Sequence, residues 1–189
     1  MFIEKLKEKP VIAGVRNLKD IPLALERGVG VLFLLVGDIF DLIKIKKEVK
    51  SSGVLLFSHM DLMKGIARDK AGISFLRKNI GVDGILTTHT NLIQFAKKEG
   101  LITIQRLFIL DSEALKTGVR VVQTCNPDAV EILPGIILPS LKEDLQHLNF
   151  PPIIAGGLIK TKQEVKNILQ AGALAISTSK KELWGENWK

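Results

Sequence analysis

The sequence predicts a small (β/α)8 TIM-like barrel with parallel strands, formed by residues 1–189 as a single domain. Eight short apolar and β-branched runs recur along the chain, each nearly continuous, as in parallel strands that are covered on both faces. Polar segments with helical periodicity lie between these runs. The starts of the runs are roughly 20 to 30 residues apart, which gives the chain an approximate internal repeat.

The expected strands are the eight apolar runs. In chain order they are VIAGV from Val11, VLFLLV from Val31, VLLFSHM from Val54, GILTT from Gly84, ITIQRLF from Ile102, AVEIL from Ala129, IIAGG from Ile153 and ALAIST from Ala173. A closed barrel pairs both edges of every strand, whereas the alternative, an open doubly wound sheet, leaves two edges exposed. The repeat favours the barrel, and no linker or shift in composition indicates a second domain.

The expected helices lie between the strands, and several of them end in glycine. Examples are LKDIPLALERG (18–28), DLIKIKKEVKSSG (41–53), AGISFLRKNIG (71–81) and NLIQFAKKEG (91–100). Three later helix starts match the capping box, in which two side chains satisfy free amides: Ser140 with Glu143, Thr161 with Glu164, and Ser179 with Glu182. Because 189 residues are few for this fold, we expect some helices to be short or missing.

The composition favours a cytoplasmic protein without a membrane partner. No apolar run reaches the length that crosses a bilayer. The first ten residues, MFIEKLKEKP, place charges on both sides of their few apolar residues, unlike a signal peptide. Cys125 is the single cysteine, so there is no disulfide framework, and a reducing compartment fits best.

The net charge of +7 fits two interpretations. It suits a nucleic-acid partner, and it equally suits a solvated surface rich in lysine. Lysines gather in two stretches that are typical of solvated helix faces: Lys44, Lys46, Lys47 and Lys50, then Lys97 and Lys98. Aromatic residues make up only 5% of the chain and Tyr is absent, whereas platforms that stack RNA bases need aromatic rings. Composition alone therefore favours RNA only weakly.

Polar residues follow nearly every predicted strand. In a barrel the carboxyl ends of the strands meet at one mouth, where functional residues gather. As a set these residues favour a ligand site over a ring of solvated loop ends. They are Arg16, Asp38, His59, Asp61, Thr88, His89, Gln105, Arg106 and Glu131.

Two adjacent glycines, Gly156 and Gly157, follow the seventh strand, and Ser177 and Thr178 close the eighth. The loops after strands seven and eight form the usual phosphate site of barrels. Glycines let backbone amides approach an anion, and a helix N-terminus adds partial positive charge. We therefore predict a phosphate site at these four residues. The alternative is a tight turn that precedes the cap at Thr161.

The residues do not identify a reaction. A Schiff-base aldolase needs a lysine at a strand end, and none of the eight runs contains one. Asp38, His59, Asp61 and Glu131 are acceptable ligands for a divalent ion, but the three histidines lack a zinc-like spacing. His59 and Glu131 would also suit an acid/base pair. We expect a phosphorylated small molecule as ligand, with no metal and no cofactor.

Seven segments resemble one family, the glycerol-3-phosphate-responsive antiterminators of bacterial glycerol-uptake operons (the GlpP family). They run in order from Val15 to Trp184 and cover nearly the whole chain. The combination of IQRLF, EILPG and AGGLIKT is the most specific part. The segments are VRNLKD, HMDLMKGIARDKAGISFL, DGILTT, TIQRLF, PDAVEILPG, AGGLIKT and STSKKELW.

The resemblance implies a barrel that binds glycerol 3-phosphate as its effector and acts on leader mRNA without catalysis. It implies phosphate contacts near Gly156, Gly157, Ser177 and Thr178. It makes a further set of residues candidates for the glycerol end of the ligand or for ordering loops: Arg16, His59, Asp61, Arg106 and Glu131. Relatives often carry Arg and Asn where His89 and Lys180 stand, and Arg where Lys160 stands. A lysine keeps the charge but loses the bidentate fork of an arginine.

The sequence does not locate the RNA surface, because it contains no recognisable RNA-binding motif. Ligand and RNA are both anions and would compete for one site, so we expect RNA on lysine-bearing helices or across a homo-oligomer. The rival function is a sugar-phosphate isomerase, epimerase or lyase that uses His59, Asp61 or Glu131.

Overall fold

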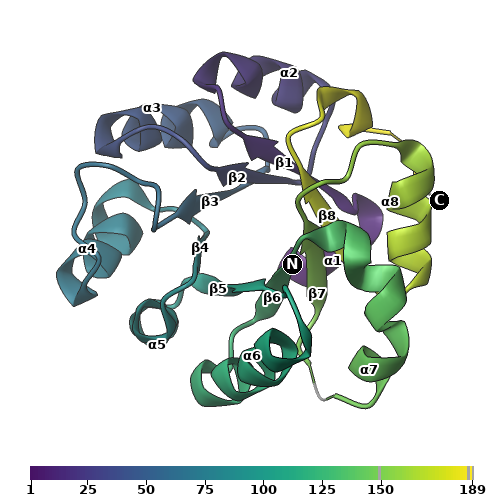
Figure 1. Cartoon of the computed structure of the whole chain (residues 1–189). Coiled ribbons are helices and arrows are strands. Elements are labelled where there is room, and N and C mark those ends of the chain that lie inside the picture. The colour runs from purple at the N-terminus through teal and green to yellow at the C-terminus, as the bar shows by residue number, and fades with distance from the viewer. Residues whose placement is uncertain (149, 187, 189) are drawn as a thin grey trace.

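The computed structural model is a closed ring of eight parallel strands in chain order (Figure 1). It describes residues 1–148, 150–186 and 188. The first and last strands pair with each other, with Val11 opposite Ile176, so the ring has no open edge. The predicted barrel is confirmed, and the open sheet was the wrong alternative.

Each of the eight predicted apolar runs forms a strand. Most strand residues are buried, because the barrel interior covers one face and the helices cover the other. The bounds are β1 Val11–Val15, β2 Val31–Leu34, β3 Leu55–His59, β4 Gly84–Thr87, β5 Ile102–Phe108, β6 Ala129–Leu133, β7 Ile153–Gly156 and β8 Ala175–Thr178.

The helices surround the ring and differ widely in length (Figure 1). As expected for a compact chain, α2 and α7 are short, and among the described residues after β8 the 3₁₀ turn η4 is the only helical element. None of the described helices is long and apolar enough to cross a membrane. The α-helices are α1 Phe2–Glu8, α2 Ile21–Glu26, α3 Ile39–Val49, α4 Lys70–Phe75, α5 Thr90–Lys98, α6 Ser112–Cys125, α7 Lys142–Gln146 and α8 Lys162–Gln170. The shorter turns are η1 Leu18–Asp20, the π-turn η2 Leu76–Ile80, η3 Gly135–Leu141 and η4 Lys181–Leu183.

The interior of the barrel is filled at the amino ends of its strands. Helix α1, which the sequence analysis did not predict, buries Phe2 and Leu6 against inward side chains that include Ile12, Phe33 and Phe57. The rings of Phe2 and Phe57 lie 5.2 Å apart between centroids. A second, larger core lies between the strands and the outer helices. Helix α1 therefore closes the end of the barrel that the amino ends of the strands form, and the polar residues gather at the opposite end, the mouth.

Side-chain caps begin several helices next to the mouth. The predicted capping box of Thr161 and Glu164 is confirmed at α8. Asp38 and Asp41 form a second box at α3, and Asp111 caps α6. Aspartate oxygens accept hydrogen bonds from backbone N–H groups as serine and threonine oxygens do. These two helices are therefore capped although their sequences lack the pattern of Ser or Thr followed by Glu.

Two predicted capping boxes are wrong. Ser140 lies inside the 3₁₀ turn η3, so its backbone is already helical, and α7 begins at Lys142 with no side-chain cap. An N-cap residue needs an extended backbone before the helix, which Ser140 does not have. The second prediction fails by one residue, because Lys180 and not Ser179 precedes the short turn η4.

Candidate anion-binding site at the barrel mouth

A cavity of ≈ 210 Å³ opens at the carboxyl ends of the strands, lined by residues of β1, β5, β6 and β8 and of the loops that follow β1, β2, β7 and β8. Four basic side chains line it, and Glu131 is the single acidic residue among the lining residues that the structure describes. A cavity walled by one sign of charge concentrates ions of the opposite sign. The four basic residues are Arg16, Arg106, Lys160 and Lys180. The site is therefore suited to an anion.

The loop after β7 has an unusual backbone. Gly157 has φ of +81° and Leu158 has φ of +61°, and both residues line the cavity. Glycine adopts this left-handed conformation readily, but a leucine does so rarely and at a cost of about 1–3 kcal/mol. Such strain persists where the surroundings enforce it, and it concentrates at ligand sites.

Backbone amides of the loops after β7 and β8 are available to a ligand. Among the described residues, the N–H groups of Gly157, Leu158 and Ser179 donate no hydrogen bond to the protein. The amide of Lys160 is engaged, because it donates to Glu164 Oε2 at 2.6 Å. Free amides beside basic side chains form the kind of cradle that binds phosphate groups.

Gly156 is needed for a different reason from Gly157. It lies buried at the end of β7 and does not line the cavity. A Cβ at this position would come within 2.6 Å of Ser177 Oγ and 2.7 Å of Glu131 Oε1. Gly156 therefore makes room for a buried hydrogen bond below the cavity, whereas Gly157 provides the turn that shapes the cavity wall.

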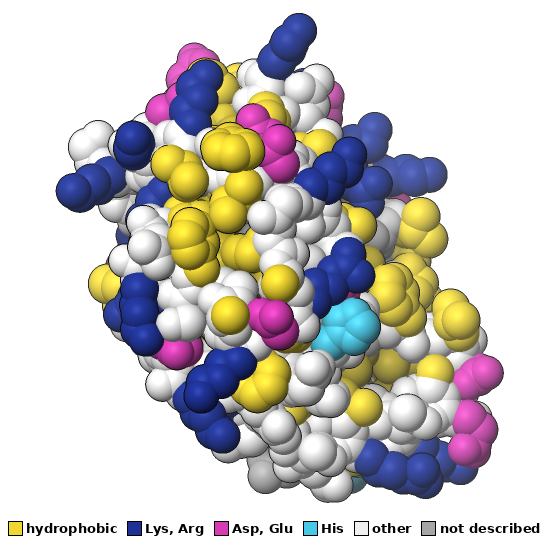
Figure 2. All heavy atoms as spheres, turned by 90° about the vertical axis from the view of Figure 1, so that its left-hand side faces the viewer, with side chains coloured by type: hydrophobic (Ala, Val, Ile, Leu, Met, Phe, Trp, Pro, Cys, Tyr) yellow, Lys and Arg dark blue, Asp and Glu magenta, His cyan; other side chains and the backbone are white. Residues whose placement is uncertain are grey.

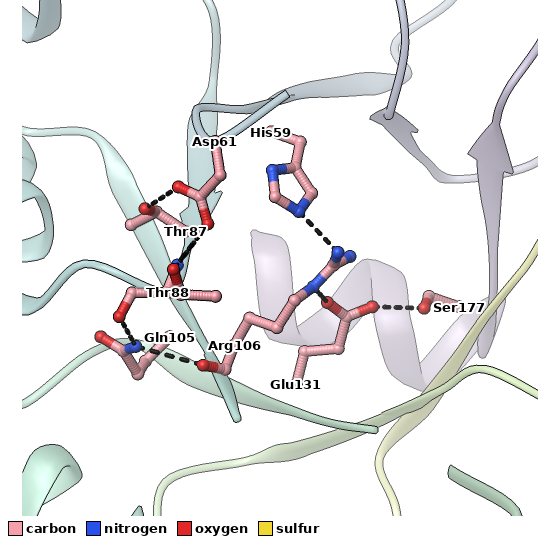
Figure 3. Close-up of polar contacts among 8 residues, drawn as sticks. All are labelled: His59, Asp61, Thr87, Thr88, Gln105, Arg106, Glu131 and Ser177. Atoms are coloured by element: carbon pink, nitrogen blue, oxygen red, sulfur yellow. Dashed lines mark hydrogen bonds and ion pairs between the residues drawn. The ribbon is translucent and has the colours of Figure 1, made fainter. Parts of the chain in front are cut away.

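That hydrogen bond belongs to a polar chain that crosses the mouth (Figure 3). Ser177 Oγ donates to Glu131 Oε1, and Arg106 Nε lies 2.6 Å from Glu131 Oε2. Arg106 Nη1 lies 2.5 Å from His59 Nε2. Arg106 and Glu131 are neighbours in register on β5 and β6. Removing one partner of a buried ion pair leaves an uncompensated charge, so each partner holds the other in place.

His59 ends this chain on β3. Burial, followed by the positive charge of Arg106, lowers the pKa of His59 from 6.5 to about 4. The imidazole is therefore neutral near pH 7. Its Nε2 accepts from the guanidinium, so the proton resides on Nδ1, which has no hydrogen-bond partner among the described residues.

Asp61 joins the loop after β3 to the end of β4. Its carboxylate accepts from the Thr87 hydroxyl and from the amide and hydroxyl of Thr88, both at 2.8 Å. Burial alone would raise the pKa of Asp61, but these hydrogen bonds outweigh it and lower the pKa below its ordinary value. Gln105 extends the connection, because its Nε2 donates to the Thr88 carbonyl at 2.9 Å. Asp61 thus fastens the loop after β3 to the loop after β4.

Of the thirteen residues that the sequence placed at the mouth, six line the cavity: Arg16, Arg106, Glu131, Gly157, Ser177 and Thr178. Thr88 and Gln105 line a neighbouring hollow, and His89 directly precedes α5. The other four do not line it. Gly156 and His59 lie directly behind the wall, Asp61 fastens two loops, and Asp38 caps α3. The described residues contain no group of three or more His, Cys, Asp or Glu side chains that is placed to hold a metal ion.

Two cavity residues, Lys160 and Lys180, were absent from the predicted ligand set. Each follows one of the predicted phosphate segments within three residues. Their position after a glycine or serine turn at a strand end is the signal that would have identified them.

The fold and the cavity together define a class: a (β/α)8 barrel with an anion site between the loops that follow β7, β8 and β1. Within that class, this chain belongs to the family of glycerol-3-phosphate responsive antiterminators, whose family model matches residues 11–184. The resemblance identified in the sequence is thereby confirmed.

Several relatives match almost the whole chain. The glycerol uptake operon antiterminator regulatory protein of Listeria monocytogenes is 37% identical, covers 94% of this chain and 95% of its own, and superposes with a TM-score of 0.86. An antiterminator-related protein of Thermotoga maritima is 34% identical over 94% and 99% of the two chains, with a TM-score of 0.83. An uncharacterized protein of Escherichia coli, YgcP, is 34% identical over 97% of this chain and 95% of its own.

Proposed function

We propose that this protein is a cytoplasmic sensor that binds glycerol 3-phosphate at the barrel mouth and then acts on the leader mRNA of glycerol-uptake genes. The cavity carries the proposal, because four basic side chains and several free amides surround a single buried carboxylate. The family name supplies the effector and the antitermination role.

The cavity has two chemically different ends that fit the two ends of the ligand. Gly157, Leu158 and Ser179 offer amides near Lys160 and Lys180, which suits the phosphate. Glu131 is the acidic group of the wall, and carboxylate oxygens accept from hydroxyl groups. We assign the phosphate to the loops after β7 and β8 and the glycerol hydroxyls to the side of Glu131.

Binding without catalysis fits this arrangement better than the rival enzyme. Both Glu131 oxygens are engaged, one with Arg106 and one with Ser177, and His59 does not line the cavity. A general base must reach the proton that it removes. We therefore propose that the protein needs no cofactor and turns over no sugar phosphate. Turnover of one in a metabolite screen would contradict this.

Substitution at Gly157 tests the phosphate site. Gly157→Asp places a negative charge at the wall, and Gly157→Asn is the matched control, because asparagine has a similar shape and also tolerates a positive φ. By calorimetry we expect Gly157→Asp to abolish glycerol 3-phosphate binding and Gly157→Asn to retain more of it. Equal loss in both variants, or equal affinity of the unaltered protein for glycerol, would contradict the assignment.

A further inference from the structure

The exposed hydrophobic residues of this protein are concentrated at the mouth. Seven large hydrophobic side chains are exposed among the described residues, and five of them lie at the carboxyl end of a strand or in the segment that follows one. Leu158 is one of these and belongs to the ligand cavity. The other four are Phe40 (77% exposed), Leu62 (49%), Phe108 (54%) and Leu110 (83%).

Phe40 and Leu62 lie on the part of the rim that carries two basic residues, Lys64 and Arg68, and hydrogen bonds connect this part to β5, at whose end Phe108 and Leu110 lie. The Ile39 amide donates to the Lys64 carbonyl at 3.1 Å, which brings Phe40 next to the segment with Leu62. Arg68 donates to the Asp61 carbonyl, and Asp61 binds Thr88, which in turn contacts Gln105 on β5. We call these residues the loop 2–5 rim: Phe40, Leu62, Lys64, Arg68, Phe108 and Leu110.

The side of the barrel that carries α3, α4 and α5 shows the same mixture of side chains. Hydrophobic groups lie exposed beside Lys and Arg there (Figure 2). On the rim, Lys64 and Arg68 have no carboxylate within ion-pair distance among the described residues. The nearby aspartates are engaged: Asp38 and Asp41 cap α3, Asp61 binds two threonines, and Asp69 caps α4.

From this arrangement we infer that the loop 2–5 rim is the surface that binds the leader RNA, an inference that rests on the proposed function. Cations without carboxylate partners attract the phosphates of a single strand, and exposed aromatic rings stack its bases. Phe40 and Phe108 provide two such rings. Contact between two copies through the same rim would bring like charges together, so a second copy fits this surface less well.

The inferred surface also explains how two anions, glycerol 3-phosphate and RNA, could bind without competing for one site. Phosphate binds beside β7, β8 and β1, whereas the rim follows β2, β3 and β5, so ligand and RNA would occupy different parts of the mouth. Arg106 lies between them, because it lines the ligand cavity and also a hollow beside Phe108. This location differs from the two that the sequence analysis expected, the lysine-bearing helices and a surface across a homo-oligomer.

The test measures binding of the 5′ leader transcript of the glycerol-uptake gene from the source genome, by fluorescence anisotropy with saturating glycerol 3-phosphate. The rim variants are the double substitution Phe40→Ala with Phe108→Ala, and Lys64→Gln. The matched controls are Phe75→Ala, an exposed phenylalanine at the end of α4, and Lys50→Gln, an exposed lysine after α3. All five side chains lie on the surface, so calorimetry should show unchanged glycerol 3-phosphate binding.

We expect the aromatic double variant to weaken RNA binding by about tenfold or more. Lys64→Gln should reduce the salt dependence by about 0.7 log units per tenfold change in salt, and both controls should bind normally. Normal binding by the rim variants with loss in Lys50→Gln would overturn the location and leave the proposed function intact. A change in oligomeric state without a change in RNA affinity would show a contact between copies instead. No RNA binding by the unaltered protein, with or without effector, would overturn the RNA role itself.

Discussion

At the scale of single residues, function depends on which side chains are left free. One buried chain of hydrogen bonds engages the side chains of His59, Arg106, Glu131 and Ser177 with one another. In contrast, Lys160 and Lys180 present their charges at the cavity wall. On our proposal, the two free lysines meet the phosphate of the effector. The occupied groups would hold the cavity wall in shape and present Glu131 to the glycerol hydroxyls.

His59 should make the stability of the protein depend on pH. Its pKa is 6.5 in the unfolded chain and about 4 in the folded protein. Between these two pH values the unfolded chain therefore binds a proton at His59, whereas the folded protein does not. The free energy of unfolding should therefore fall as pH falls, by up to about 1.4 kcal/mol per pH unit and by about 3 kcal/mol in all. Urea unfolding between pH 6.5 and 5 measures this slope above the range in which Asp61 titrates.

His59→Gln should flatten that slope, and His89→Gln should not, because His89 is exposed. A slope that persists in His59→Gln would assign the effect to another group.

Sequence reasoning found most of the polar side chains of the cavity wall but not their roles. Strand ends are visible as the ends of apolar runs, so Arg16, Arg106 and Glu131 could be placed at the mouth. Whether a polar side chain faces the cavity or a neighbour depends on register between strands distant in sequence. Arg106 and Glu131 are 25 positions apart, and only their pairing on β5 and β6 reveals that they bind each other. The different roles of Gly156 and Gly157 also depend on contacts that are distant in sequence, because Gly156 packs against Glu131 and Ser177.

At the scale of elements, the start of α8 holds the loop after β7. Thr161 Oγ1 accepts from the Glu164 amide at 3.2 Å, and Glu164 Oε2 accepts from the amides of Lys160 and Thr161. The helix cap therefore fixes the backbone of a cavity residue. This capping box could be predicted from four letters of sequence because both partners are local, whereas the 3₁₀ path through Ser140 could not.

Thr161→Ala should lower the free energy of unfolding by about 1 kcal/mol, because α8 loses its side-chain cap. It should also weaken glycerol 3-phosphate binding, because the Thr161 hydroxyl holds the amide of Glu164, whose carboxylate anchors the Lys160 amide. Asp111→Ala is the matched control: it removes the cap of α6, which accepts from the Ala114 amide at 2.8 Å. Chemical unfolding and calorimetry should show a similar loss of stability in both variants and a loss of affinity in Thr161→Ala alone. Equal affinities would mean that the cap does not support the site.

At the scale of the whole molecule, closure makes the barrel one cooperative unit. Each strand has two neighbours, and the amino-terminal helix α1 contributes to the interior core. The repeat of strands and helices predicted this ring because every repeat carries its own apolar run. Helix α1 escaped prediction because it stands outside the repeat, and its partners Phe33 and Phe57 are distant in sequence.

Leu6→Ala should therefore destabilise the entire barrel, by about 2–5 kcal/mol, because Leu6 is fully buried beneath the strands. Leu110→Ala, the same truncation at an exposed leucine, should change stability by at most about 0.5 kcal/mol. Thermal unfolding followed by circular dichroism compares the two. A small effect of Leu6→Ala, confined to fraying of α1, would show that the helix is peripheral.

Helix α1, which closes the amino end of the barrel, has a consequence for the order in which effector and RNA bind. With that end filled, the effector enters and leaves through the same face that we assign to RNA. A bound transcript would then hinder the escape of an effector already inside, and it would equally hinder the entry of one that comes late. On this proposal, the order in which effector and transcript arrive would become part of the signal. A protein that binds the effector before the transcript emerges would retain it, and a protein that binds the transcript first would stay empty.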